Sequence, residues 1–360
     1  EHPPADWNEL FQQDPLWTLQ AATMGWAYGY TVPLPPLFRS VSPTVHPALR
    51  PKQVFDDTNG GIRAPFLLEV PQWYEGVPHR YLLYTASTEG PCLGLAGASV
   101  LTGPWTKLEP PLCANDGPPG WGVRIGSPAV VADPARRRFA LFYDLLPRSG
   151  KGKAKTFTAV SSSPVDYRSG VCECLLGDGN FAPFVVGGKL YALANLVVAS
   201  APPSFLENPC PDRCQGAAWA AAPRAVGAPE PTKQPERQYR SWVVPLHGSA
   251  LLFSSVARDV AEAIQVEVLD VVSEDYREWK ILGNISTEVR RPRFTWEGVH
   301  RSAASLQNPK LAKASSGFGL QDPFVVLVDQ ALHMYFSGGG AKGIGYCRLI
   351  INSDSTIRTW

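Results

Sequence analysis

The chain has 360 residues, of which 44% are hydrophobic, so it is too apolar to be disordered, and no apolar run reaches the roughly 18 residues that a membrane helix needs. Lys and Arg number 33 against 32 Asp and Glu, and the net charge of +1 excludes the basic surface typical of nucleic-acid binders. The length fits two domains or one large β unit, and 35 Pro, 32 Gly and 11% aromatic residues favour many short strands over long helices.

The first segment, residues 1–55, is rich in Pro and Trp and shows no clear polar/apolar alternation, so we expect an arm packed on the domain that follows. After it, one short proline-led phrase recurs, and each copy predicts a strand. The copies are Ala64-Pro65-Phe66-Leu67-Leu68, Ser127-Pro128-Ala129-Val130-Val131, Ala182-Pro183-Phe184-Val185-Val186 and Asp322-Pro323-Phe324-Val325-Val326, with a diverged copy at Ser241-Trp242-Val243-Val244.

A second strand-like run follows each copy within a few to about 17 residues. These runs are Arg80-Tyr81-Leu82-Leu83-Tyr84, Arg138-Phe139-Ala140-Leu141-Phe142-Tyr143, Lys189-Leu190-Tyr191-Ala192-Leu193, Ser249-Ala250-Leu251-Leu252-Phe253-Ser254 and Ala331-Leu332-His333-Met334-Tyr335-Phe336. Third strands are expected over residues 93–101, 156–161, 264–271 and 343–349. The chain therefore contains five units of three or four short antiparallel strands.

Repeats of roughly 55 to 80 residues with this content are typical of propeller blades. We predict an all-β fold, a five-bladed β-propeller over residues 56–360, with a loop insertion at about 199–238 that interrupts the third unit. A β-sandwich is the alternative, but it gives no reason for a proline-led phrase to restart each unit.

The seven cysteines do not have the two spaced pairs of a zinc site, so no metal or other cofactor is expected. Cys210 and Cys214 are close enough in sequence for a disulfide, and the odd total leaves at least one thiol free or bonded to another chain. The glycosylation sequon Asn284-Ile285-Ser286, and a chain that begins at Glu1 without methionine, favour a secreted protein.

The wording of the last two units resembles bacterial five-bladed β-propeller proteins that are similar to family 43 glycoside hydrolases. The resemblance covers roughly residues 56–350 and is most specific in the C-terminal third. It is carried by Leu252-Phe253-Ser254-Ser255-Val256, Asp275-Tyr276-Arg277-Glu278-Trp279, Gln321-Asp322-Pro323-Phe324 and Gly343-Ile344-Gly345. It implies a propeller that binds a sugar at the mouth of its central channel.

The departures from that family concern its catalytic residues. Family 43 hydrolases carry an aspartate base on the first blade, a second aspartate on the second blade and a glutamate acid on the third. The corresponding phrase openings here read Arg63-Ala64, Gly126-Ser127 and Phe181-Ala182, without a carboxylate. The resemblance therefore does not transfer the family's catalytic residues to this chain.

Other carboxylates stand near the predicted channel. Asp322 is the first candidate by position, although an Asp before Pro also orders loops. Inverting hydrolysis needs two carboxyl groups roughly 6.5 to 9.5 Å apart, and Asp322 with Asp178 or Asp57 would meet this need across a narrow channel. Glu262 and Glu297 would each supply an acid from a loop over the channel, or form a salt bridge with a neighbour of the type of Arg258 or Arg301. Glu297 and Asp57 are also candidates for contacts to the sugar.

Arg63, Arg124 and Arg240 are expected at channel positions, where guanidinium groups recognise an anionic sugar such as a uronate or a sulfated unit, or pair with Asp178 and Asp322. Trp242 is a candidate for stacking on a sugar ring, and His300 for an acid, a base or a ligand contact.

The first functional hypothesis is a propeller that hydrolyses a glycosidic bond. The competing hypothesis is a propeller that binds sugar without cleaving it, or whose channel serves another reaction. A third is a protein-interaction propeller, which would expose an apolar top face in place of a polar pocket. Two carboxylates converging in the channel would favour the enzyme, and one or none the binder. No nucleic-acid or membrane partner is expected.

Overall fold

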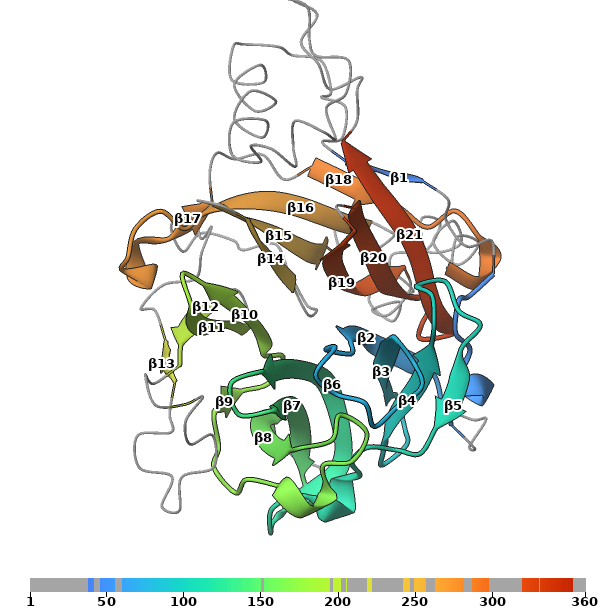
Figure 1. Ribbon diagram of the computed structural model, residues 1–360. Coiled ribbons are helices and arrows are strands. Elements are labelled where there is room, and N and C mark those ends of the chain that lie inside the picture. The colour runs from blue at the N-terminus through green and yellow to red at the C-terminus, as the bar shows by residue number, and fades with distance from the viewer. Residues whose placement is uncertain are drawn as a thin grey trace, which may run out of the picture.

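The computed structural model describes residues 38–41, 46–55, 60–149, 152–194, 197–201, 205, 219–221, 242–246, 249–256, 263–281, 287–297, 319–329 and 331–351. In these residues the chain is all-β, as predicted: strands and turns are joined by five short 3-10 helices (Figure 1). The helices are η1 (Pro51–Gln53), η2 (Ala114–Asp116), η3 (Arg168–Gly170), η4 (Tyr276–Glu278) and η5 (Thr295–Glu297). None of the described helices is long and apolar enough to cross a membrane.

The described strands form five antiparallel sheets. The first contains β2 (Ile62–Glu69), β3 (Tyr81–Ser87), β4 (Leu93–Ala98) and β5 (Thr106–Leu108). The second contains β6 (Trp121–Asp133), β7 (Arg138–Pro147), β8 (Lys155–Ser161) and β9 (Gly177–Asp178). The third contains β10 (Ala182–Val186), β11 (Lys189–Ala194), β12 (Val197–Ser200) and β13 (Ala220–Ala221).

The fourth sheet contains β14 (Trp242–Leu246), β15 (Ser249–Val256), β16 (Ala263–Asp270), β17 (Lys280–Ile281) and β18 (Thr287–Arg290), the last two both pairing with β16. The fifth contains β19 (Leu320–Val328), β20 (Ala331–Gly338) and β21 (Gly343–Ile351), and its fourth strand is β1 (Phe38–Val41) from the other end of the chain. A segment of the expected N-terminal arm therefore completes the last sheet.

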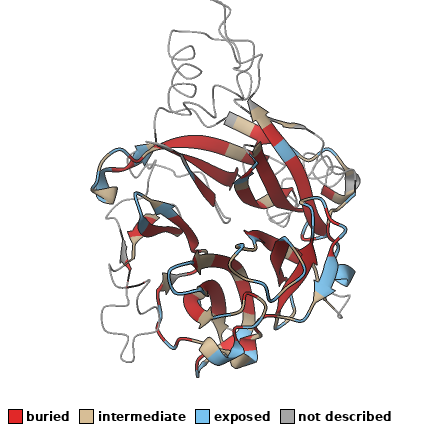
Figure 2. Ribbon diagram, viewed as in Figure 1, coloured by how far each residue is buried: buried red, intermediate tan, exposed pale blue. Residues whose placement is uncertain are grey.

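The first strands of the five sheets contact one another in a cycle. Strand β2 contacts β6, β6 contacts β10, β10 contacts β14, β14 contacts β19, and β19 contacts β2 again. In Figure 1 these strands lie nearest the centre of the molecule, with the later strands of each sheet outside them. Figure 2 shows that the sheets are mostly buried, while many of the turns between strands are exposed.

The proline-led phrase marks a backbone irregularity in three of these strands. In β2, β6 and β19 the pairing register shifts across the proline. Just before that proline, Ala64, Ser127 and Asp322 have φ values of 50°, 49° and 49°. Proline cannot donate to the ladder, and a β-bulge with one residue at positive φ lets the strand continue past it. The bulges lie near the N-terminal ends of β2 and β19 and in the middle of the longer β6.

The aromatic residues of the same phrase fill the centre. The rings of Phe66 and Phe324 lie 4.9 Å apart, and Trp242 lies 5.5 Å from the first and 4.7 Å from the second. The three side chains come from three different sheets and are all buried. This corrects the sequence-based expectation for Trp242: its indole packs between two phenyl rings and is not a platform for a sugar.

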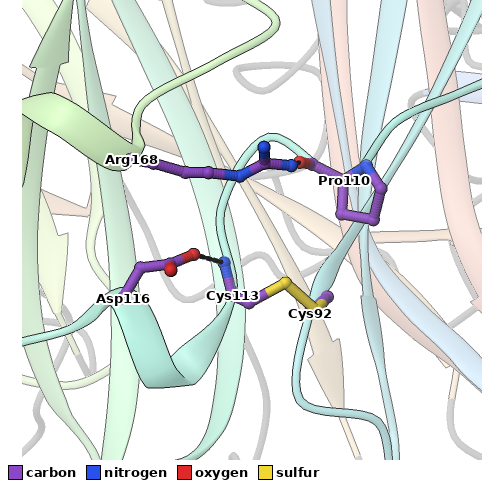
Figure 3. The surroundings of a disulfide bond; sticks show 5 residues. All are labelled: Cys92, Pro110, Cys113, Asp116 and Arg168. Atoms are coloured by element: carbon purple, nitrogen blue, oxygen red, sulfur yellow. Dashed lines mark hydrogen bonds between the residues drawn. A yellow bond between two sulfur atoms is a disulfide. The ribbon is translucent and has the colours of Figure 1, made fainter.

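Disulfides connect loops at the edge of the sheets. Cys92 and Cys113 are bonded to each other and join the start of β4 to the start of η2 (Figure 3). Cys172 and Cys174 are also disulfide-bonded. Among the described residues, Cys347 is the free cysteine and is buried in β21. Cys210 and Cys214, which the sequence suggested as a pair, lie outside the described residues.

Candidate functional site

A cavity of about 230 Å³ opens beside the bulges of β2, β6 and β19. Its walls come from the first, second and fifth sheets, with one residue from the loop that leads into the third. The lining residues are Arg63, Ala64, Arg124, Ile125, Gly126, Ser127, Asp144, Leu146, Ala154, Asn180 and Asp322. Three of the residues predicted from the sequence, Arg63, Arg124 and Asp322, thus meet at one cavity.

The two arginines come from neighbouring strands. Arg63 lies on β2 immediately before the bulge, and Arg124 lies on β6; both are partly buried. Nη1 of Arg124 donates a hydrogen bond of 2.8 Å to the carbonyl of Thr88. Burial lowers the pKa of Arg124, and the positive charge of Arg63 lowers it further. Because both guanidinium groups line the same cavity, their positive charges repel each other.

Asp322 occupies the bulge of β19 and bridges two sheets. Its Oδ2 accepts hydrogen bonds of 3.1 Å from the backbone N of Ala64 and from Oγ of Ser337. The side chain is buried, with a relative exposure of 8% for the residue. Asp322 thus orders the junction between the first and fifth sheets, and it also lines the cavity.

A second carboxylate in the cavity, Asp144 on β7, was not identified from the sequence. Its Oδ1 accepts from Oγ1 of Thr156 at 2.6 Å, and its Oδ2 accepts from the backbone N of Asn180 at 2.7 Å. Oδ1 of Asn180 in turn accepts from Oγ of Ser127 at 3.2 Å. Asp144 follows Leu141-Phe142-Tyr143 directly, and a carboxylate in so apolar a strand was the available signal.

The openings of the first three proline-led phrases, where the resemblance to family 43 implies catalytic carboxylates, have other roles here. Ala64 and Ser127 line the cavity. Phe181 is buried, and its ring lies 5.4 Å from that of Trp219. None of these three positions can act as an acid or a base, which agrees with the departures seen in the sequence.

Glu297 is a structural residue, which corrects its prediction as a sugar ligand or acid. It is fully buried and paired with the equally buried Arg290, and it accepts from the backbone N of Arg293 at 2.5 Å and of Phe294 at 3.1 Å. Its carboxylate therefore has no face open to a ligand. Glu297 thus forms a salt bridge, as in the alternative, but its partner is Arg290 and not Arg258 or Arg301.

The side chains of the remaining predicted residues lie outside the part of the chain that the structure describes. The backbone of Asp178 lies in β9, opposite Lys155 of β8. Asp57, Arg240, Glu262 and His300 lie outside the described residues. Their predicted roles stay predictions.

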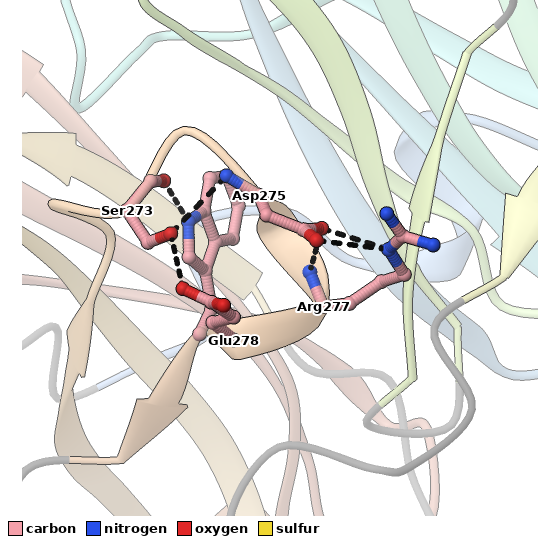
Figure 4. A network of polar contacts seen from close by, with 5 residues as sticks. Ser273, Asp275, Arg277 and Glu278 are labelled. Atoms are coloured by element: carbon pink, nitrogen blue, oxygen red, sulfur yellow. Dashed lines mark hydrogen bonds and ion pairs between the residues drawn. The ribbon is translucent and has the colours of Figure 1, made fainter.

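A larger cavity, of about 650 Å³, lies near the C-terminal end of β10. It is lined by the β10–β11 turn, the end of β12 and the η4 loop, and includes the rings of Tyr191 and Tyr276. Figure 4 shows the hydrogen bonds that fix this loop: Asp275 accepts from both the backbone N and Nε of Arg277, and Ser273 donates to Glu278. Two charged groups on this rim, Asp275 and Arg277, are thus paired with each other.

Comparison with known proteins gives a match for the fold alone, since neither protein-family models nor curated protein sequences match the chain. A GH43 β-xylosidase/α-arabinofuranosidase from a compost microbial metagenome, in complex with xylotriose, has a TM-score of 0.55 at 12% identity, covering 90% of this chain and 98% of that one. A GH43 enzyme from Xanthomonas citri, also with xylotriose, has a TM-score of 0.54 at 12% identity, covering 93% and 95%. An α-L-arabinofuranosidase from Lactobacillus brevis has a TM-score of 0.52 at 10% identity, covering 85% and 96%. The resemblance to family 43 glycoside hydrolases read from the sequence is thereby confirmed at the level of the fold.

Proposed function

We propose that the protein is a five-bladed β-propeller that binds a carbohydrate in the cavity between β2, β6 and β19. The closed cycle of contacts among the five first strands supports the propeller. The similar structures from the compost metagenome and from Xanthomonas citri are complexes with xylotriose, which supports a carbohydrate as the ligand class. The cavity lies among the innermost strands, at the mouth of the proposed channel.

The observation that carries the proposal is the mixture of polar groups that the bulges bring to this cavity. Arg63 and Arg124 provide hydrogen-bond donors, and Asp322 and Asn180 provide acceptors. A sugar ring presents hydroxyl groups that need both kinds of partner. The volume of about 230 Å³ is below the roughly 300–1,000 Å³ of drug-sized pockets, and therefore suits one sugar unit.

Binding without cleavage is the function that the geometry supports best. Hydrolysis needs one carboxyl group to deliver a proton and a second to activate water. Both oxygens of Asp144 accept hydrogen bonds, and Oδ2 of Asp322 accepts two. These contacts hold three of the four carboxylate oxygens as acceptors of hydrogen bonds from the protein itself.

Hydrolysis is the second candidate, because Asp144 and Asp322 line the same cavity. Two carboxylates converging on one site are the minimum that glycoside hydrolysis requires. In this version Asp144 and Asp322 share the acid and base roles, and the sequence-based pairs of Asp322 with Asp178 or Asp57 remain alternatives.

A screen of neutral and acidic glycans for binding and for released reducing ends tests both candidates. We expect bound glycans and no release. Release that is lost in both Asp144→Asn and Asp322→Asn, with thermal unfolding unchanged in at least one of them, would establish the hydrolase instead. If no glycan binds and none is cleaved, the proposed function is wrong.

We also propose that the protein works in an oxidising compartment, in line with the expected secretion. The disulfide between Cys92 and Cys113 and the disulfide-bonded Cys172 and Cys174 support this proposal, because such bonds persist outside the reducing cytosol. Alkylation of the protein as it is purified from its native source, followed by mass analysis, should leave these four cysteines unmodified.

A further inference from the structure

The cavity holds two positive charges that come from different sheets. A Cβ built on Gly126 of β6 would lie 3.9 Å from Nη2 of Arg63, so the guanidinium of Arg63 extends from β2 toward the second sheet. Arg124 lies two residues before Gly126 on the same strand. Both side chains line the cavity and both are partly withdrawn from water. Bringing like charges together in this way costs free energy unless an anion lies between them.

The carboxylates of the cavity do not supply that anion. Asp322 binds the backbone N of Ala64 and the hydroxyl of Ser337. Asp144 binds Thr156 and the backbone N of Asn180. Among the described residues, neither carboxylate forms an ion pair with Arg63 or Arg124; the hydrogen bond that Arg124 makes goes to a neutral carbonyl, that of Thr88. The alternative in which Asp322 neutralises these arginines is therefore not realised.

We propose that the sugar bound in this cavity carries an acidic group, a carboxylate or a sulfate, which lies between Arg63 and Arg124. The inference rests on the proposed carbohydrate binding and names its ligand class. A guanidinium has five N–H donors and no acceptor, and its planar fork matches two oxygens of a carboxylate or sulfate. The hydroxyl groups of the sugar ring then face the acceptors of the same cavity, Asp322 and Asn180.

Binding of galacturonate, glucuronate and a sulfated galactose, each compared with the neutral sugar by calorimetry, tests this inference. We expect the acidic sugar that fits the cavity best to bind at least about tenfold more tightly than its neutral counterpart, because hydrogen bonds between charged groups replace neutral ones. Inorganic sulfate and acetate are measured alongside to separate recognition of a sugar from binding of any anion. We expect both to bind more weakly than the acidic sugar.

Variants identify the side chains responsible. Arg63→Gln and Arg124→Gln should each weaken the acidic sugar about tenfold or more and weaken the neutral sugar clearly less, because Gln keeps a hydrogen-bond donor for a hydroxyl group but loses the charge. Arg124→Lys keeps the charge without the fork and should fall between wild type and Arg124→Gln. Arg168→Gln is the matched control, because the exposed Arg168 also donates to a backbone carbonyl, that of Pro110, but lies outside the cavity.

The outcomes separate this inference from the proposed function. If neutral and acidic sugars bind equally, or if the Gln variants weaken both to the same extent, the acidic group is wrong while carbohydrate binding stands. If acetate or sulfate binds as tightly as the acidic sugar, the cavity is an anion site and not a sugar site. If no sugar of either kind binds, the proposed function itself is wrong.

Discussion

His333 is the described histidine with the most restricted environment. It lies on β20, and Nδ1 is 2.8 Å from the hydroxyl of Tyr346 on β21. Burial lowers the pKa of His333, and the charge of its cross-strand neighbour Arg348 lowers it further. A backbone hydrogen bond at Val328 and the charge of Asp329 oppose this shift only in part. The folded protein therefore favours the neutral imidazole.

This environment predicts a loss of stability in mild acid. Between the lowered pKa of folded His333 and the usual value of about 6.5 in the unfolded chain, the unfolded state binds more protons. The free energy of unfolding should therefore fall as the pH drops below about 6.5, by at most about 1.4 kcal/mol per pH unit from this residue. Urea unfolding at pH 7.5, 6.5 and 5.5 measures it. The variant His333→Gln should show a smaller slope, and equal slopes would contradict the assignment.

The sequence predicted residues of the candidate site only where they lie in or beside the repeated phrase. Arg63, Arg124 and Asp322 adjoin the proline-led phrase, and the first strands of a propeller face its channel, so their convergence followed from the pattern. Asp144 lies on β7, the second strand of its sheet. Hydrogen bonds from Thr156 and Asn180, which are distant in sequence, hold its carboxylate at the cavity. Glu297 shows the opposite case: the sequence suggested a loop residue over the channel, but its carboxylate forms a buried ion pair with Arg290.

At the scale of elements, the bulge at each proline of β2, β6 and β19 places the residue before that proline at positive φ. Ala64 has a φ of 50°, which costs a residue with a Cβ roughly 1–2 kcal/mol, while Ala129, two residues after the bulge of β6, has an ordinary negative φ. Ala129→Gly should lower the free energy of unfolding by at least about 0.5–1 kcal/mol. Ala64→Gly should leave it unchanged or raise it by up to about 1 kcal/mol, because relief of the strain offsets the added entropy of the unfolded chain. Chemical denaturation of the two variants makes the comparison, and an equal loss in both would argue against strain at the bulge.

The disulfide between Cys92 and Cys113 closes a loop with a sequence separation of 21. A loop of this length stabilises a folded chain by about 3 kcal/mol through the entropy of the unfolded state. The double variant Cys92→Ala/Cys113→Ala should lose about that much free energy of unfolding in non-reducing denaturation. Each single variant should lose nearly the same amount, because either change breaks the same bond. A clearly larger loss in the double variant would indicate contacts beyond the bond itself.

The elements were easier to predict than their partners. Strand-forming residues alternate with turn residues over short distances, so the first, second and third strands of most sheets followed from local pattern. No local pattern shows that β1 would pair with β21, or that Cys92 would bond to Cys113. Both features depend on which distant segments the fold brings together.

At the scale of the whole molecule, β1 joins the two ends of the described chain. It forms the outer edge of the fifth sheet, and the hydroxyl of Ser40 accepts a hydrogen bond of 3.1 Å from Nη1 of the buried Arg290. Arg290 also pairs with Glu297 and lies over the ring of Phe336, 5.0 Å from its centroid. Strand β1 thus satisfies a buried cation as well as a sheet edge.

Deletion of residues 1–41 should therefore be far more harmful than deletion of residues 1–37, which leaves β1 in place. The longer deletion removes the Ser40 hydroxyl that accepts from buried Arg290 and exposes the edge of β21. A loss of about 1–3 kcal/mol is expected from the unpaired donor, together with self-association. Thermal unfolding and light scattering of both variants provide the measurement. Equal stability of the two would show that β1 contributes little.

The pairing of β1 with β21 also has a consequence for the order of folding. Phe38 pairs with Ile351, so almost the entire described chain lies between two neighbouring residues of one sheet. During synthesis the N-terminal segment leaves the ribosome long before its partner exists, and it has to stay unpaired without joining another open edge. The final docking step closes a loop of nearly the whole polypeptide, which makes it a natural candidate for the slowest event in refolding.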